Sequence, residues 1–185
     1  MPVQIGAKSP TFNDPTGLLS DCHRRIEMFL GSLQAVANVI DQPPTEKVTQ
    51  ALETALRYFS EAAPKHTADE EESLFPRLRQ ISNPEVANAF AGLRQLEQDH
   101  RRADQLHAEV ERLGRKYLSD RQLSVQQIAL FRATIRDLRS MYERHIAVED
   151  NEVFPLATRL LNDQDKSAIA GEMAGRRKVE LVNLK

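Results

Sequence analysis

Apolar residues recur at alternating intervals of three and four positions through most of the chain, the spacing of a helix that buries one face. Capping residues and prolines divide this pattern into four long segments and a short fifth one. The segments are expected to begin at Asp14-Pro15, Thr45, Ser82-Asn83-Pro84, Ser124 and Asn162, with Asp41-Gln42-Pro43-Pro44 ending the first and Ser119-Asp120 near the end of the third. This order favours an all-α fold, an up-down-up-down four-helix bundle whose short fifth helix runs to about Gly175.

The predicted inward stripe of each long helix carries polar side chains among its aliphatic ones. These inward polar residues are His23; His66 and Glu70; His100 and His107; and Tyr142, His145 and Glu149. An unpaired carboxylate in an apolar core costs several kcal/mol, so such groups need partners. A bound metal ion would supply them, and the alternative is a polar network that satisfies every buried group unaided.

The chain repeats one pattern of residues in its two halves. Residues 66–76 read HTADEEESLFP and residues 145–155 read HIAVEDNEVFP, and a lone histidine, His23 or His100, precedes each copy by one helix. Residues four apart on a helix face the same way, so each histidine and its glutamate share one face. In an antiparallel bundle the four histidines would lie roughly 12–24 Å from the same end. The repeat therefore predicts a nearly two-fold symmetric site.

A symmetric site of this kind suits two metal ions about 3–4 Å apart that are bridged by two carboxylates. Each ion would receive two imidazoles and one oxygen from each of Glu70 and Glu149. A solvent-derived oxo or hydroxo bridge would leave one position open on each ion. Imidazole and carboxylate without thiolate favour iron or manganese over structural zinc. An open position on a redox-active pair suits a small diatomic ligand or peroxide.

With these residues the chain resembles the hemerythrin-like (HHE cation-binding) family, in its bacterial type with four histidines and two glutamates. The resemblance covers about Asp14 to Leu161 and implies a four-helix bundle around a non-haem centre of two iron ions, oxo or hydroxo bridged, with manganese or zinc as substitutes. The implied metal ligands are His23, His66, Glu70, His100, His145 and Glu149. Oxygen-carrying hemerythrins have a fifth histidine where this chain has Asp104, which argues against simple oxygen carriage.

Several polar residues near these positions have roles that the sequence leaves open. His107 follows His100 by two helical turns, and we expect it to pack in the core or support the site rather than bind metal. Glu27 and Asp104, one turn after His23 and His100, are expected to orient the imidazoles, although a metal bond or a solvent-facing position is an alternative. Tyr142 could equally form a hydrogen bond near the metals or pack in the core.

Three further expectations concern the surroundings of the site. Glu71, Glu72 and Asp150 flank the bridging glutamates and are predicted to form a solvated acidic rim. Pro64 is predicted to kink its helix just before His66. Cys22 points about 100° away from His23 on an ideal helix and is interpreted as structural.

Composition limits the domain content, the partners and the cellular location that are expected for the chain. A chain of 185 residues with 41% hydrophobic and 28% charged residues fits one helical domain over residues 14–185, preceded by an arm over residues 1–13. The net charge of −2 predicts neither nucleic acid nor a membrane as a partner, and no apolar run is long enough to span a bilayer. The first ten residues lack the apolar core of a signal peptide, and the single cysteine excludes an intramolecular disulfide. These features predict a cytoplasmic protein.

The leading functional hypothesis is a non-haem di-iron protein that binds or reacts with O2, NO or peroxide in sensing, scavenging or stress defence. A di-iron oxidase or peroxidase is an alternative from the enzyme class. An iron-binding or iron-delivery protein and a metal-free helical interaction module are the others. The sequence assigns no catalytic residue, no substrate and no oligomeric state.

Overall fold

The computed structural model describes the chain from residue 14 to residue 179, and for residues 88–92 it describes the backbone only. The expected arm over residues 1–13 lies outside the described residues. The helices are α1 (Pro15–Val39), α2 (Glu46–Glu61), α3 (Ala63–Ala68), η1 (Asp69–Leu74), α4 (Phe75–Gln80), α5 (Pro84–Asp120), α6 (Val125–Val148), η2 (Glu149–Val153), α7 (Phe154–Leu160) and α8 (Asp163–Arg177). Segments η1 and η2 are π-helical. Every element among the described residues is helical, which confirms the all-α class.

Side-chain caps begin the long helices where the sequence predicted them. Asp14 accepts a hydrogen bond from the backbone N–H of Gly17, with Pro15 in the first turn of α1. Thr45 and Asn83 cap α2 and α5 in the same way, and Asn162 caps α8. Ser124 forms the predicted capping box with Gln127 at the start of α6. These bonds satisfy backbone donors that have no partner inside the helix.

Two of the predicted helices are interrupted rather than continuous. The second consists of α2, α3, η1 and α4 in succession, and the fourth consists of α6, η2 and α7. Pro64 lies in the first turn of α3, directly after the break at Ala62. The helix breaks there because proline has no N–H to donate to the preceding turn. The predicted kink before His66 is therefore confirmed. The two π-helical segments were not predicted.

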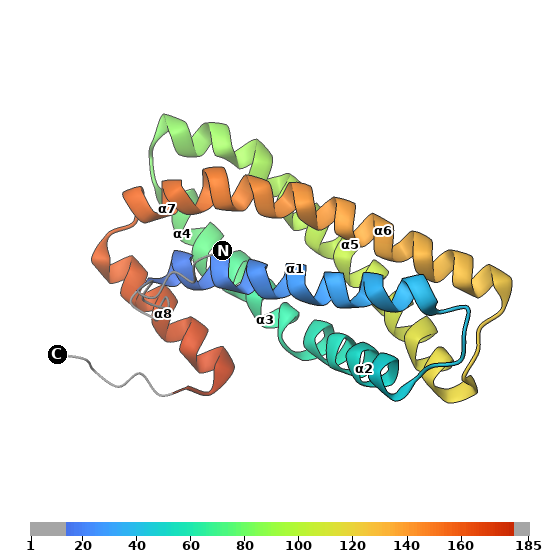
Figure 1. Cartoon of the computed structure of the whole chain (residues 1–185). Coiled ribbons are helices and arrows are strands. Elements are labelled where there is room, and N and C mark those ends of the chain that lie inside the picture. The colour runs from blue at the N-terminus through green and yellow to red at the C-terminus, as the bar shows by residue number, and fades with distance from the viewer. Residues whose placement is uncertain (1–13, 180–185) are drawn as a thin grey trace, which may run out of the picture.

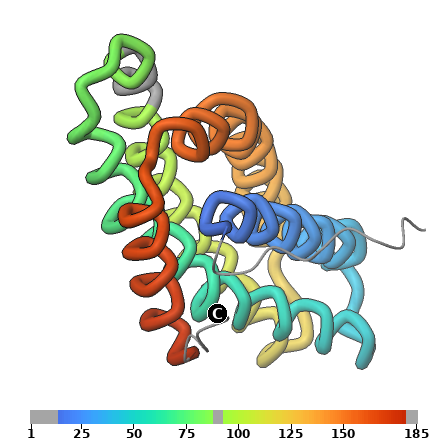
Figure 2. The backbone as a smooth tube through the Cα atoms, turned by 90° about the vertical axis from the view of Figure 1, so that its left-hand side faces the viewer, coloured from blue at the N-terminus to red at the C-terminus, as the bar shows by residue number. Residues whose placement is uncertain are grey.

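The helices pack as a bundle with a crossing helix at one end. Helix α1 contacts both α2 and α6, and α5 contacts α6 and α2. Figure 1 shows α1 lying between α6 and α2. Helix α8 crosses the end of the bundle, where it contacts η1, α1 and α3 (Figure 2). None of the described helices is long and apolar enough to cross a membrane.

The buried apolar side chains form two clusters. One fills the bundle between α1, α2, α5 and α6 and includes Leu33, Leu52, Phe131 and Ile135. The other lies at the α8 end and contains Leu19, Leu74, Phe75, Phe154, Leu96, Ile169 and Met173. On α1 the buried His23 stands between Leu19 of the second cluster and Ile26 of the first. The polar layer predicted from the sequence thus lies between two apolar layers.

Candidate metal centre

All six side chains predicted to bind metal are buried in the bundle. His23 comes from α1, His66 from α3, Glu70 from η1, His100 from α5, His145 from α6 and Glu149 from η2. Both glutamates are 0% exposed, and His100, the most accessible of the six, is 6% exposed. The structure therefore brings together residues from both halves of the chain, as the repeated pattern predicted.

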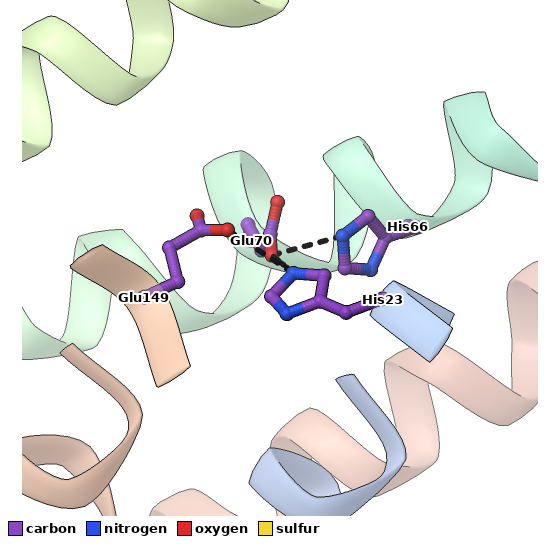
Figure 3. A group of neighbouring side chains, drawn as sticks. All are labelled: His23, His66, Glu70 and Glu149. Carbon is purple, nitrogen blue, oxygen red and sulfur yellow. Dashed lines mark ion pairs between the residues drawn. The ribbon is translucent and has the colours of Figure 1, made fainter. Parts of the chain in front are cut away.

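The six residues form two overlapping groups. One contains His23 and His66, the other contains His100 and His145, and both contain Glu70 and Glu149. Within each group one donor atom from every residue lies within 4.8 Å of the others. Figure 3 shows the first group, with His23 and His66 both turned toward Glu70. Two glutamates common to both groups are what a doubly bridged pair of ions requires.

The two glutamates present their oxygens differently. Glu70 Oε1 lies 3.2 Å from His66 Nε2, and Glu70 Oε2 lies 3.3 Å from His100 Nε2, so this carboxylate divides its oxygens between the groups. Glu149 uses a single oxygen, Oε2, which lies 3.1 Å from His23 Nε2 and 3.0 Å from His145 Nε2. Both arrangements place carboxylate oxygens between nitrogens of different groups.

These short contacts are not ordinary hydrogen bonds. The four carboxylate oxygens of Glu70 and Glu149 and the Nε2 atom of His23 are all buried without a hydrogen-bond partner in the described part of the chain. Buried polar atoms are nearly always paired in folded proteins, since leaving them unpaired costs free energy. The atoms converge within ion-pair distance of one another, and imidazole nitrogen with carboxylate oxygen is a donor set suited to iron or manganese. The residues therefore fit a metal ion in each group.

The outer ring nitrogens of two histidines contact carboxylates outside the groups. His23 Nδ1 lies 2.9 Å from Asp150 Oδ1, and His100 Nδ1 lies 2.8 Å from Glu71 Oε1. A neutral imidazole that donates its Nδ1 proton to a carboxylate keeps the lone pair of Nε2 free for a metal ion. The contacts cross between the halves, because Asp150 follows Glu149 and Glu71 follows Glu70.

These contacts correct two predictions. Glu27 and Asp104 were expected to orient the imidazoles, but both are exposed, and Glu27 pairs with Arg24 instead. Asp150 and Glu71 were assigned to a solvated rim, yet their side chains are only 22% and 34% exposed, and each contacts a histidine. The signal was present in the sequence, since an acid directly follows the glutamate in both copies of the pattern.

The charges of the six side chains influence one another strongly. Burial alone lowers the pKa of His23, but contacts with Glu149 and Glu70 outweigh it and raise the pKa to about 10. For His100 burial is likewise outweighed, mainly by Glu70, and its pKa is raised to about 9. Burial raises the pKa of Glu70, but nearby His66, His100 and His23 more than compensate and hold it well below its usual value. A divalent cation would compete with the protons on these imidazoles, because a histidine ligand must be neutral.

Comparison with known proteins agrees with this geometry. The model of the hemerythrin HHE cation binding domain matches residues 14–157, which is most of the chain. The chain belongs to the hemerythrin HHE cation-binding domain family. It is also 27% identical over 172 residues to an uncharacterized protein of Haemophilus influenzae, covering 92% of this chain and 94% of that relative.

In this hemerythrin domain Glu70 and Glu149 each stand at a π-helical turn. The backbone carbonyl of Glu70 accepts a hydrogen bond from the N–H of Phe75, five residues later, and Glu149 bonds Phe154 in the same way. Pro76 and Pro155 come next, in the first turns of α4 and α7, where no proline N–H is needed. The repeated Phe-Pro pair thus marks the end of a widened turn, and such turns are frequent at functional sites.

One phenylalanine of these pairs packs against the centre. Both Phe75 and Phe154 are buried, and the Phe154 ring stacks on His23 with centroids 5.2 Å apart and planes inclined by 16°. The stacking limits rotation of the imidazole. Phe154 therefore helps to fix the direction in which His23 Nε2 points.

His107 and Tyr142 form a second polar pair beside the centre. His107 Nε2 lies 3.0 Å from the Tyr142 hydroxyl, and the His107 ring stacks on Phe59 at 4.2 Å. His107 belongs to neither metal-ligand group, in agreement with its predicted supporting role, and burial lowers its pKa to about 4. Tyr142 packs 6.3 Å from the His145 ring, measured between centroids. Tyr142 thus packs in the core and also forms a hydrogen bond beside the centre, the two roles between which the sequence did not decide.

A hollow of about 190 Å³ opens beside this pair. Its lining includes Phe59, Ala63, Ala103, His107 and Tyr142. Ala63, Ala103 and Tyr142 each stand three residues from a histidine of the centre, so the hollow lies about one helical turn from it. The hollow has room for a molecule of a few atoms, but none of the six side chains lines it.

Proposed function

We propose that the chain is a non-haem di-iron protein built as an up-down-up-down four-helix bundle, and that its centre binds or reacts with O2, NO or peroxide. The proposed metal ligands are His23, His66, Glu70, His100, His145 and Glu149. The observation that carries the proposal is the presence of both glutamates in each of two buried four-residue groups. Two ions bridged by two carboxylates account for every one of these donors, whereas a single ion leaves one pair of histidines unused.

The donor atoms favour iron over a structural zinc ion. Neither group includes a thiol, although the buried Cys22 is adjacent to His23 in the sequence. Iron or manganese accepts mixed imidazole and carboxylate ligands, while structural zinc sites usually contain cysteine. When bound, a pair of iron ions would supply redox-active positions for a diatomic ligand or peroxide.

The remaining side chains would orient the ligands and keep water out. Asp150 and Glu71 hold protons at Nδ1 of His23 and His100, so both rings present Nε2 to the centre. Phe75, Phe154 and the aliphatic layers on either side exclude bulk water. The 190 Å³ hollow beside His107 and Tyr142 has room for a ligand of a few atoms.

The proposal is tested by metal analysis of the anaerobically purified protein, followed by optical titration of the reduced protein with O2, NO and peroxide. We expect two iron ions per chain and a spectral change with at least one of the three ligands. Reversal of that change on removing the ligand indicates binding, whereas repeated consumption of added oxidant indicates an oxidase or peroxidase. Protein that takes up no metal after reconstitution with Fe²⁺ would refute the proposal.

A further inference from the structure

Asp69, the residue before Glu70, is a fully buried carboxylate that is paired with arginines of α8. Arg176 Nη1 lies 3.0 Å from Asp69 Oδ1, and Arg177 Nη2 lies 2.6 Å from Asp69 Oδ2. Asp69 is 0% exposed. Each carboxylate oxygen therefore has its own guanidinium partner.

Helix α8 makes further contacts with the same π-helical segment. Arg176 also donates to Ser73 Oγ at 2.9 Å and to Glu72 Oε2 at 2.9 Å. Arg77 directly follows the Phe75-Pro76 pair. It donates hydrogen bonds to the backbone carbonyl of Ser73 and to Glu172 of α8. The contacts extend along η1 from its first residue to its fifth.

Apolar packing holds α8 in the same place. Ile169 and Met173 are buried in one cluster with Leu74 and Phe75, which lie at the end of η1 and the start of α4. The crossing of α8 over the bundle end is visible in Figures 1 and 2. The arginines are thus carried on a helix that is itself anchored.

Loss of these arginines would leave a buried negative charge without a partner, which is far more costly than loss of a surface ion pair. The Asp69 carboxylate could then reach water only if η1 moved. Glu70 is the next residue in the same segment, so it would move as well. The position of a bridging glutamate therefore depends on the contact between η1 and α8.

In the second half of the site the arginine contact is of a different kind, because Asp150 of η2, whose side chain is 22% exposed, pairs with Arg24 of α1 and not with α8. Val148 occupies the position before Glu149, where the first half has the buried Asp69. The matched hemerythrin domain ends at residue 157, whereas α8 covers Asp163–Arg177. The support for Glu70 thus comes from a helix outside the matched domain.

We propose that Arg176 and Arg177 are positioning residues that fasten η1 and thereby set how firmly Glu70 retains metal, while Glu149 is independent of them. Helix α8 acts as a clamp on one half of the centre. The inference rests on the proposed metal-binding function and assigns a role to a segment that this function does not itself require.

The test compares Arg176→Ala/Arg177→Ala with the full-length wild type. Metal loss to a chelator and amide hydrogen exchange are both measured. We expect metal to leave about 10–100-fold more readily, the range typical for residues that orient metal ligands. Exchange should accelerate over residues 69–75 and stay unchanged over residues 149–154. Arg177→Ala alone gives a milder version should the double variant fold poorly.

Two further variants separate positioning from general stability. Asp69→Val makes the first half resemble the second, and in the double variant it should restore metal retention because no buried charge remains. Arg159→Ala removes an arginine of α7 that pairs with Glu85 on the surface, and it should change neither readout. Wild-type metal retention in the double variant, or no restoration by Asp69→Val, would overturn the clamp. Absence of metal in the wild type would instead refute the proposed function, and the exchange data would still decide whether α8 fastens η1.

Discussion

The two π-helical segments carry equivalent glutamates but are held in place by different means. Segment η1 begins with the buried Asp69 and is tied to α8 by Arg176 and Arg177, whereas η2 follows the apolar Val148. Within the site the halves match, since Glu71 contacts His100 and Asp150 contacts His23. The two halves therefore share the same converging side chains and the same contacts between acid and histidine, but each half is held in place by different neighbouring residues.

The largest effect is expected from removing a bridging carboxylate. Glu70→Ala and Glu149→Ala should each lose at least one of two metal ions, because each glutamate belongs to both groups. Folding should persist in both variants, since two apolar clusters supply most of the buried surface. Metal per chain by elemental analysis, with circular dichroism as the folding control, checks this. Full metal content in either variant would show that the two halves are not equivalent.

A smaller effect is expected from the acids that orient the histidines. Asp150→Asn and Glu71→Gln should weaken metal binding about 10–100-fold each, because the carboxylates hold His23 and His100 through Nδ1. Chelator competition measures the affinity. Glu27→Gln and Asp104→Asn are matched controls, exposed acids one turn after the same histidines, and they should bind metal like the wild type. Equal losses in controls and test variants would contradict the assignment.

His107→Ala should still bind two metal ions, because His107 lies outside both groups and contacts Tyr142 instead. Elemental analysis of His107→Ala and Glu149→Ala side by side compares the metal content per chain of the two variants. Loss of metal in His107→Ala together with retention in Glu149→Ala would invert the proposed set of ligands.

The smallest effect concerns the pH dependence of stability. Burial lowers the pKa of His107 to about 4 in the folded chain, below its value of about 6.5 in an unfolded one. As the pH falls from about 6.5 to about 4, His107 takes up a proton in the unfolded chain but stays neutral in the folded chain. His107 therefore lowers the free energy of unfolding over this interval. His107→Gln should therefore lose less stability than the wild type over that interval. The midpoints of urea unfolding, measured for both proteins at several pH values, give this difference in stability. Midpoints that fall with pH in parallel for the two proteins would contradict the expectation.

Local sequence signals were sufficient to predict where the helices start and which six side chains converge in the core. Caps such as Asp14 and Ser124 act within one turn, so they can be identified without tertiary structure. The six donors stand out because buried stripes seldom contain histidine four residues before glutamate in two copies. Convergence of those residues then followed from helix length and direction alone.

The supporting residues required knowledge of what packs against each helix. Glu71 and Asp150 follow the glutamates by one position, about 100° around an ideal α-helix, which predicts a solvent-facing side chain. The π-helical turns alter that direction locally, and the neighbouring α5 and α1 supply the histidines. Asp69 likewise becomes buried only because α8 crosses the bundle end. Such contacts depend on residues far apart in sequence.

We expect two metal ions to share Glu70 and Glu149. Anomalous diffraction at the iron edge, from crystals of the anaerobically reconstituted protein, tests it most directly. We predict two peaks about 3–4 Å apart, the usual separation of paired metal ions, with both glutamates between them. A single peak with only histidine nitrogens around it would contradict the account.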